Sequence, residues 1–117
     1  MSSDVKIDEV RSYSSGTIGR ALNTARGVTY PIDSSTRPGD VPTTIESFLS
    51  GISACGVTLI ELHAQQKGLP FGSLEVAIEG IRTEASMPDF ATIDIQFQFA
   101  GIDQEQAAYY VDVWKKH

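Results

Sequence analysis

The sequence predicts an α+β protein in which helices pack on one face of antiparallel sheet. Apolar residues recur at three- and four-residue steps along residues 44–67, which indicates one long helix with a buried face. Residues 91–100 alternate between apolar and polar side chains, which is typical of a half-buried strand. Because strands come in runs on both sides of the long helix, antiparallel pairing is favoured over a parallel α/β sheet.

Three strands in a meander are expected before the long helix. Val5 and Ile7 share one face of the first strand, opposite charged neighbours. The second and third strands are expected to turn at Asn23-Thr24. Pro31 places the third at a sheet edge, because proline cannot donate a ladder hydrogen bond. The expected strands cover residues 4–11, 17–22 and 26–32, with a loop at residues 12–16.

The long helix has clear signals at both ends. Residues 33–43 are rich in Ser, Thr, Pro, Gly and Asp and are expected to form the loop before it. Thr43 or Thr44 is suited to cap its first turn, where Glu46 matches the positive end of the helix dipole. Gly68 is suited to end it, because glycine readily adopts the left-handed conformation that follows many helices.

The middle of this helix is expected to be buried. No residue from Ser47 to Ile60 is charged, and the residues around Cys55 are small, which lets other elements approach the backbone closely. The uncharged run of about 14 residues is shorter than the about 20 that a bilayer span needs. We therefore expect a core helix that is surrounded by protein.

A hairpin and a final helix are expected after the long helix. Strands at residues 73–83 and 91–100, joined by a short loop, favour antiparallel pairing. Asp103 with Gln106 three residues later resembles a capping box at the start of the last helix. Its packed face is expected to carry Ala107, Tyr110, Val111 and Trp114, and its negative end is matched by Lys115, Lys116 and His117.

Length and charge limit the classes of function. The 117 residues predict a single domain over residues 1–117, and burial within it would gain from an obligate dimer. A net charge of −6 argues against nucleic acid or an anionic membrane as the main partner. The first ten residues have no apolar core, so no signal peptide is expected. One cysteine excludes an internal disulfide framework and fits a cytoplasmic protein.

Cys55 is the only intrinsically strong nucleophile in the chain, and two interpretations of it remain open. A free cysteine in a helix commonly packs as a small apolar side chain. A reactive thiolate instead needs a nearby cation, because the middle of a helix gains nothing from the helix dipole. Arg20, Arg26 and Arg37 lie upstream and are the candidate cations.

Glu46 is a second candidate site residue, although its spacing from Cys55 restricts its role. Nine residues are two and a half helical turns, so the two side chains leave opposite faces of a regular helix. Glu46 would therefore act where the helix begins or across a subunit interface. Glu61 and His63 are two residues apart and cannot face one metal ion. With no glycine-rich phosphate loop either, neither a metal nor a cofactor is predicted.

The segment Pro42–Cys55, PTTIESFLSGISAC, opens Pro-x-x-x-Glu and runs through small residues into Ala-Cys. A Gly-Leu-Pro segment, paired strands and a final helix after a Gly-x-Asp turn follow it. In these features the chain resembles the OsmC/Ohr family of thiol peroxidases over roughly residues 17–117. The resemblance implies an intertwined homodimer with antiparallel sheets packed on a long central helix, active in the oxidative stress response.

The resemblance also implies roles for individual residues. Cys55 would be the redox-active cysteine that reduces organic hydroperoxides or hydrogen peroxide. Glu46 would orient an arginine beside it. Arg20, within Gly19-Arg20-Ala21, resembles that arginine, and Arg26 is the rival position. These expectations involve no cofactor.

The chain departs from the family pattern at its end. The family's resolving cysteine follows the last helix, where this sequence stops at His117. Either the chain is a truncated form, or it lacks the second half of the cycle, in which case the oxidised Cys55 would be reduced by an external thiol or over-oxidised. Two alternatives stay open: a non-catalytic dimer that holds a small apolar ligand in its interface cleft, with the sulfur of Cys55 covered, and a structural dimer without a ligand.

Overall fold

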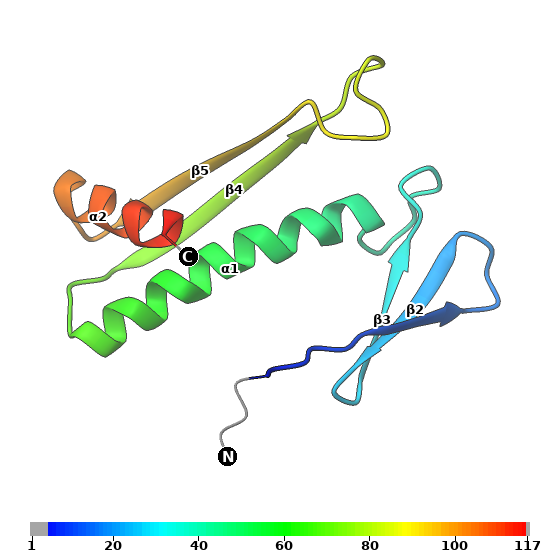
Figure 1. The fold of residues 1–117 in the computed structure, drawn as a ribbon, viewed down its shortest axis with the longest axis horizontal. Coiled ribbons are helices and arrows are strands. Elements are labelled where there is room, and N and C mark those ends of the chain that lie inside the picture. Colours follow the sequence, from blue (N-terminus) through cyan, green and yellow to red (C-terminus); the bar gives the residue numbers. More distant parts are fainter. Residues whose placement is uncertain (1–4, 117) are drawn as a thin grey trace. The chain divides into compact units, whose positions relative to one another are not determined.

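The computed structural model describes residues 5–116, which contain five strands and two helices and confirm the α+β prediction (Figure 1). By internal contacts the chain divides into two compact units, Met1–Ser47 and Phe48–His117. The single domain over residues 1–117 stays a prediction. The elements are β1 (Arg11–Ser14), β2 (Arg20–Ala25), β3 (Val28–Asp33), α1 (Thr44–Lys67), β4 (Ser73–Ile81), β5 (Thr92–Ala100) and α2 (Gln104–Lys115).

The first unit contains an antiparallel sheet with the strand order β1-β2-β3, so Pro31 lies in an edge strand as predicted. β2 and β3 are joined by the two-residue turn Arg26-Gly27, whose φ angles are 49° and 82°. Tight hairpin turns with two positive φ angles need glycine or a similarly permissive residue. The predicted turn at Asn23-Thr24 is therefore wrong, because a β-branched threonine disfavours positive φ.

The first strand also differs from its prediction. Residues 5–10 form no strand, and the side chains of Val5 and Ile7 are exposed. Arg11 pairs with Thr24, and β2 ends one residue later. Residues before Arg11 therefore extend past the end of β2 and find no partner strand within residues 5–116. The predicted member Asp4 lies outside the described residues.

Helix α1 begins and ends at the predicted residues. The Glu46 backbone N–H donates to Thr43 Oγ1 (3.2 Å), and the Thr43 backbone N–H donates to Glu46 Oε1 (3.0 Å). This reciprocal pair is a capping box, so Thr43 is the cap. At the other end Gly68 has φ 64°, and the Leu69 N–H donates to the Ala64 carbonyl (3.0 Å). These hydrogen bonds use backbone groups that a helix terminus leaves unpaired.

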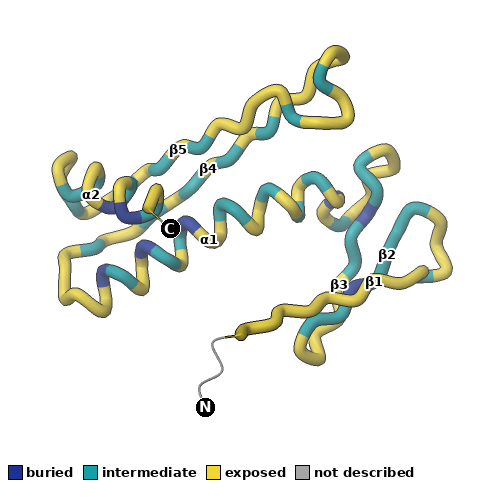
Figure 2. Tube along the Cα trace, in the orientation of Figure 1, coloured by how far each residue is buried: buried dark blue, intermediate teal, exposed yellow. Residues whose placement is uncertain are grey.

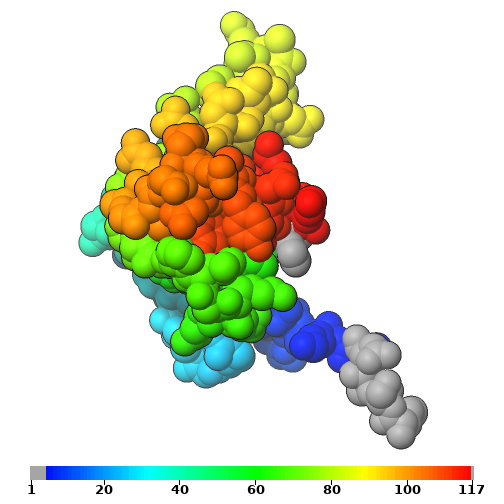
Figure 3. Space-filling view, turned by 90° about the vertical axis from the view of Figure 1, so that its left-hand side faces the viewer, coloured from blue at the N-terminus to red at the C-terminus, as the bar shows by residue number. Residues whose placement is uncertain are grey.

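The core of the second unit lies between α1, α2 and the β4–β5 hairpin. Ile60 and Ala64 of α1 and Tyr110 of α2 are buried together (Figure 2). The hairpin is antiparallel as predicted, with Ser73 opposite Ala100. In Figure 3, α2 lies against both the hairpin and α1. The partly buried side chains around this core are Phe71, Leu74, Phe97, Phe99, Ile102 and Trp114.

Helix α2 begins at the predicted capping box. The Gln106 N–H donates to Asp103 Oδ1 (2.8 Å), and the Asp103 N–H donates to Gln106 Oε1 (3.0 Å). Its predicted packed face is also confirmed, since Tyr110 is buried and Trp114 is half-buried. The predicted contribution of His117 to the helix end lies outside the described residues.

Within residues 5–116, α1 is covered on one side only, so the expectation that protein surrounds it is wrong for this part of the single chain. Gly56, Ile60 and Ala64 are buried, whereas Phe48 and Leu62 are 56% and 54% exposed. An 18-residue window of α1 has a mean hydropathy of 1.4, which membrane spans share with core helices of soluble proteins. Its packing against α2 and the hairpin supports a core helix.

Candidate functional site

Cys55 lies midway along α1 and is exposed. It borders a hollow of about 570 Å³ whose walls come from α1 and the end of α2. Because Cys55, Phe48, Ile52 and Leu59 follow one another at three- and four-residue steps, they share one face of α1. The lining residues are Phe48, Gly51, Ile52, Cys55, Leu59, Trp114 and Lys115.

The far wall of this hollow is Trp114, which a glycine on α1 allows to approach closely. A Cβ atom at Gly56 would lie 3.4 Å from Trp114 Nε1. The indole packs edge-on against Phe97, with ring centroids 5.3 Å apart. Lys115 is the one cation among the lining residues. The hollow can thus hold an apolar group beside the sulfur, with a cation at its margin.

A second site lies in the first unit, and it is polar, with Arg20 at its centre. Arg20 is the cross-strand partner of Asp33. Its Nε donates to Asp33 Oδ1 (2.6 Å) and its Nη2 donates to Asp33 Oδ2 (3.0 Å), which is a bidentate pair. The same Nη2 donates to Asp40 Oδ1 (2.6 Å). Asp33 is 3% exposed, whereas the side chain of Asp40 is 86% exposed.

These ion pairs shift the titration of all three groups. Hydrogen bonds from Arg20 hold the pKa of Asp33 and the pKa of Asp40 below the usual value of 3.8. The two carboxylates in turn raise the pKa of Arg20 above its usual range. The site is therefore fully charged at neutral pH, with one positive and two negative groups.

Within residues 5–116 of the single chain, Glu46 forms no ion pair with Arg20, and the role that the resemblance implies for it stays a prediction. Its carboxylate caps α1 at Thr43, and the carboxylates that bind Arg20 are Asp33 and Asp40. The rival Arg26 lies in the exposed turn between β2 and β3. Cys55 and Arg20 belong to different compact units.

Within residues 5–116 no group of three or more His, Cys, Asp and Glu side chains could hold a metal ion. The side chain of His63 is engaged otherwise, because its Nε2 lies 2.7 Å from the hydroxyl of Tyr109. The two rings are tilted, with centroids 5.7 Å apart.

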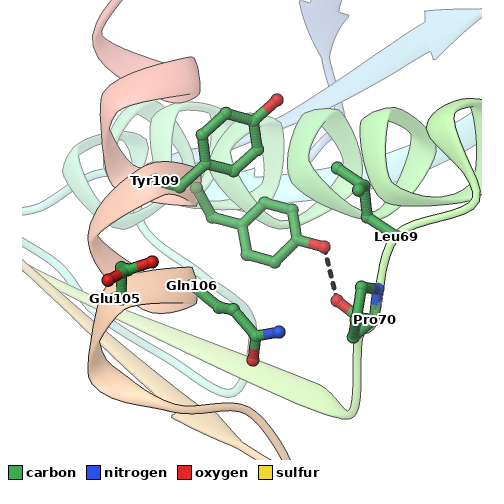
Figure 4. A pocket seen from close by; sticks show the side chains of 6 residues that line it. Leu69, Pro70, Glu105, Gln106 and Tyr109 are labelled. Atoms are coloured by element: carbon green, nitrogen blue, oxygen red, sulfur yellow. Dashed lines mark hydrogen bonds between the residues drawn. The ribbon is translucent and has the colours of Figure 1, made fainter.

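A further hollow of about 430 Å³ lies beside the start of α2 (Figure 4). The Tyr110 hydroxyl donates to the Pro70 carbonyl, and burial raises the pKa of Tyr110. With both tyrosine hydroxyls bonded to protein, the remaining polar groups are at Glu105 and Gln106. Its lining residues are Leu69, Pro70, Glu105, Gln106, Tyr109 and Tyr110.

Sequence reasoning missed Asp33 and Asp40, which it assigned only to a loop. The signal was the hairpin register: a two-residue turn at Arg26-Gly27 places Arg20 directly opposite Asp33. It also missed Lys115, which it assigned only to the end of the last helix. No local signal indicates that Lys115 lines the same hollow as Cys55, because this arrangement arises from packing between α1 and α2.

The sequence matches no family model, and no curated protein is significantly similar to it. Solved structures do share its fold. It is similar to an OsmC-like protein from Mycoplasma pneumoniae, with a TM-score of 0.80 and 15% identity over 96% of this chain and 82% of that chain. It is also similar to the organic hydroperoxide resistance protein OhrB of Bacillus subtilis, with a TM-score of 0.64 and 16% identity over 95% of this chain and 84% of that chain. A third similar structure is an organic hydroperoxide resistance protein from Elizabethkingia anophelis, with a TM-score of 0.57 and 14% identity over 96% of this chain and 83% of that chain.

Proposed function

We propose that this chain, whose fold is that of OsmC/Ohr proteins, is a thiol-dependent peroxidase that reduces organic hydroperoxides or hydrogen peroxide. Cys55 is the nucleophile. The observation that carries the proposal is the exposure of Cys55 in an apolar hollow, within a chain of this fold. An inert core cysteine would be covered by its own chain.

The chemistry needs one thiolate and one peroxide. The sulfur of Cys55 attacks one peroxide oxygen, so that an S–O bond forms and the O–O bond breaks. Cysteine is oxidised to sulfenic acid, and the leaving alkoxide takes a proton to become an alcohol. One external thiol then condenses with the sulfenic acid, releasing water and forming a mixed disulfide. A second thiol releases Cys55 as its thiol and leaves as the disulfide.

Arg20 is the cation that we assign to the thiolate, in preference to Arg26. A guanidinium close to sulfur favours the thiolate, which is the reactive form. Arg20 is held in one orientation by ion pairs, whereas Arg26 lies in an exposed turn. A fixed cation contributes more to a site than one that must be ordered when substrate binds.

We also propose that the protein acts as a homodimer in the cytoplasm, where external thiols are available. Support for the dimer comes from α1, whose large apolar residues Phe48 and Leu62 remain exposed in the single chain. A second copy packed on this side of α1 would bury them. Sedimentation should then give about twice the chain mass of 12.7 kDa.

The test is intact mass after one equivalent of tert-butyl hydroperoxide in the presence of the sulfenate trap dimedone. We expect one rapid adduct on Cys55, and no adduct on the matched Cys55→Ser variant. Absence of the adduct in the wild-type protein would contradict the proposal. It would favour the rival function, in which the hollow binds a small apolar ligand. That function requires the sulfur to be covered in the dimer, whereas in the single chain Cys55 is exposed.

A further inference from the structure

We propose that the hollow beside the start of α2 binds a small organic ammonium ion, that is, a positively charged nitrogen surrounded by methyl or methylene groups. The hollow has a volume of about 430 Å³. Small-molecule sites commonly have volumes of about 300–1,000 Å³. All its lining residues belong to the second compact unit, and Cys55 is not among them. The site is therefore separate from the proposed peroxidase reaction and from the first unit.

Two tyrosine rings supply a surface that attracts a cation. The rings of Tyr109 and Tyr110 are tilted by 58°, with centroids 5.6 Å apart. A cation is attracted to the face of an aromatic ring within about 6 Å of its centroid. At this separation of the rings, one cation can lie within that range of both. Tyr110 is 1% exposed and forms the floor of the hollow, whereas Tyr109 is 46% exposed and forms its rim.

The hydroxyl groups of both tyrosines are engaged in hydrogen bonds with protein. The Tyr110 hydroxyl donates to the Pro70 carbonyl. The Tyr109 hydroxyl lies 2.7 Å from His63 Nε2. These hydrogen bonds hold the rings in place and leave their faces for a ligand. The arrangement therefore favours a ligand that binds through ring faces, as an organic cation does.

Glu105 supplies a negative charge for such a ligand. It precedes Tyr109 by four residues, so the two side chains share one face of α2. Figure 4 shows both on the α2 side of the hollow, with Leu69 and Pro70 on the other side. Within residues 5–116 the Glu105 carboxylate forms no ion pair, and none of the residues that line the hollow carries a positive charge.

The start of α2 does not oppose a cation at this place. A helix N-terminus carries about half a positive charge. In α2 the Asp103 carboxylate accepts the Gln106 N–H (2.8 Å), and Glu105 adds a second negative charge in the same turn. Two carboxylates outweigh the helix dipole, so the local charge is negative and favours an ammonium group.

The two walls of the hollow are fixed before a ligand arrives. The capping box sets the first turn of α2 on one side. On the other side, the Leu69 N–H donates to the Ala64 carbonyl (3.0 Å). The hydrogen bond from Tyr110 to Pro70 joins the two walls. Binding therefore has little cost in ordering the protein.

The experiment titrates isotope-labelled protein with choline chloride and follows the backbone amide signals in NMR spectra. We expect saturable shifts at residues 104–110, with a Kd on the order of 1 mM, as is usual for a ligand of so few atoms. Dimethylbutanol, in which an uncharged carbon replaces the choline nitrogen, is expected to bind about tenfold more weakly. Sodium chloride at the same concentration controls for ionic strength.

Variants of two exposed residues separate the ring from the charge. Tyr109→Leu keeps an apolar side chain without a ring and is expected to weaken choline binding about fivefold. Tyr109→Phe keeps the ring and loses only the contact with His63, so its affinity is expected to stay within about twofold of wild type. Glu105→Gln removes the charge and is expected to weaken binding about threefold. Because both side chains are exposed, all three variants should fold.

Three results would each overturn the proposed site. The first is the absence of saturable shifts at residues 104–110 when choline is present far above the expected Kd. The second is equal affinity for choline and dimethylbutanol, which would mean that the charge is not recognised. The third is wild-type affinity in both Tyr109→Leu and Glu105→Gln, which would place the bound choline elsewhere.

Discussion

The Arg20 site and the Cys55 hollow are built in opposite ways. Around Arg20, charged side chains meet charged side chains at 2.6–3.0 Å, and the loop before α1 leaves no space at Gly39. Around Cys55 the lining is almost entirely apolar, and the hollow has a volume of about 570 Å³. The first site is completed by its own unit, whereas the second is open.

This difference is consistent with the roles that we propose for Arg20 and Cys55. A cation can be aimed only if it is fixed, and fixing it takes several hydrogen bonds. A nucleophilic sulfur must instead remain accessible to a substrate, so its surroundings have to stay open. The three predictions that follow test this contrast, and they run from the largest expected effect to the smallest.

The largest effect is expected away from both sites, in the core of the second unit. Tyr110→Ala should lower the free energy of unfolding by about 3–5 kcal/mol, because a buried aromatic ring is lost. Tyr110→Phe keeps the ring and loses only the hydrogen bond to Pro70, so a loss of about 1 kcal/mol is expected. Denaturant unfolding followed by the fluorescence of Trp114 measures both. Equal losses of unfolding free energy in the two variants would mean that the Tyr110 ring contributes little to stability. The packing of α1 against α2 beside the Cys55 hollow would then not depend on this core.

A smaller effect is expected when the Arg20 site is protonated. The pKa of Asp33 and the pKa of Asp40 lie below 3.8, so their stabilisation is fully present above about pH 3.8 and is lost as the pH falls through the lowered values. The Arg20 Nε–H signal in NMR spectra should shift over that range as its hydrogen bond to Asp33 is lost, while Trp114 fluorescence stays constant.

The control for this titration is Asp33→Asn, in which the Nε–H signal should be shifted already at pH 7. Among residues 5–116 no carboxylate lines the Cys55 hollow, so we expect no response to acid there. A simultaneous change of the two signals would show that the sites do not behave independently.

The smallest effect is expected at Gly51, beside Cys55. No atom lies within 4 Å of a Cβ placed there, so Gly51→Ala should stabilise α1 by about 1 kcal/mol through helix propensity alone. Gly56→Ala is the matched comparison, because its methyl group would touch Trp114, and its gain should be smaller. Thermal unfolding at low protein concentration measures the difference. A loss of stability at Gly51 would mean that a second protomer fills the hollow.

Local signals in the sequence were enough to place most of the second unit. The limits of α1, the capping box of α2 and the antiparallel hairpin were all predicted, because each depends on residues close together in the chain. The exposure of one side of α1 was not predicted. Small and uncharged residues indicate that protein packs against a helix, but they do not show whether that protein is the same chain or another one. The OsmC/Ohr fold was predicted from the Pro42–Cys55 segment and is shared by solved structures.

The first unit was predicted less well, and the error had one source. Placing the turn at Asn23-Thr24 rather than Arg26-Gly27 changed every cross-strand pair in β2 and β3. Arg20 was therefore identified as a candidate without its partners Asp33 and Asp40, and the role of Glu46 stays a prediction. The missing information was the positive backbone φ angle of Arg26. Gly27 was the only residue whose type indicated a turn at this place.

The tight turn at Arg26-Gly27 also ties the ion pair to the length of the chain. Arg20 and Asp33 are equally distant from the turn, so they meet because both strands have the same number of residues on either side of it. Deleting one residue from either strand would direct the two side chains to opposite faces of the sheet, even with both residue types retained. The distance of each residue from the turn is therefore as important for this ion pair as the identity of the two residues.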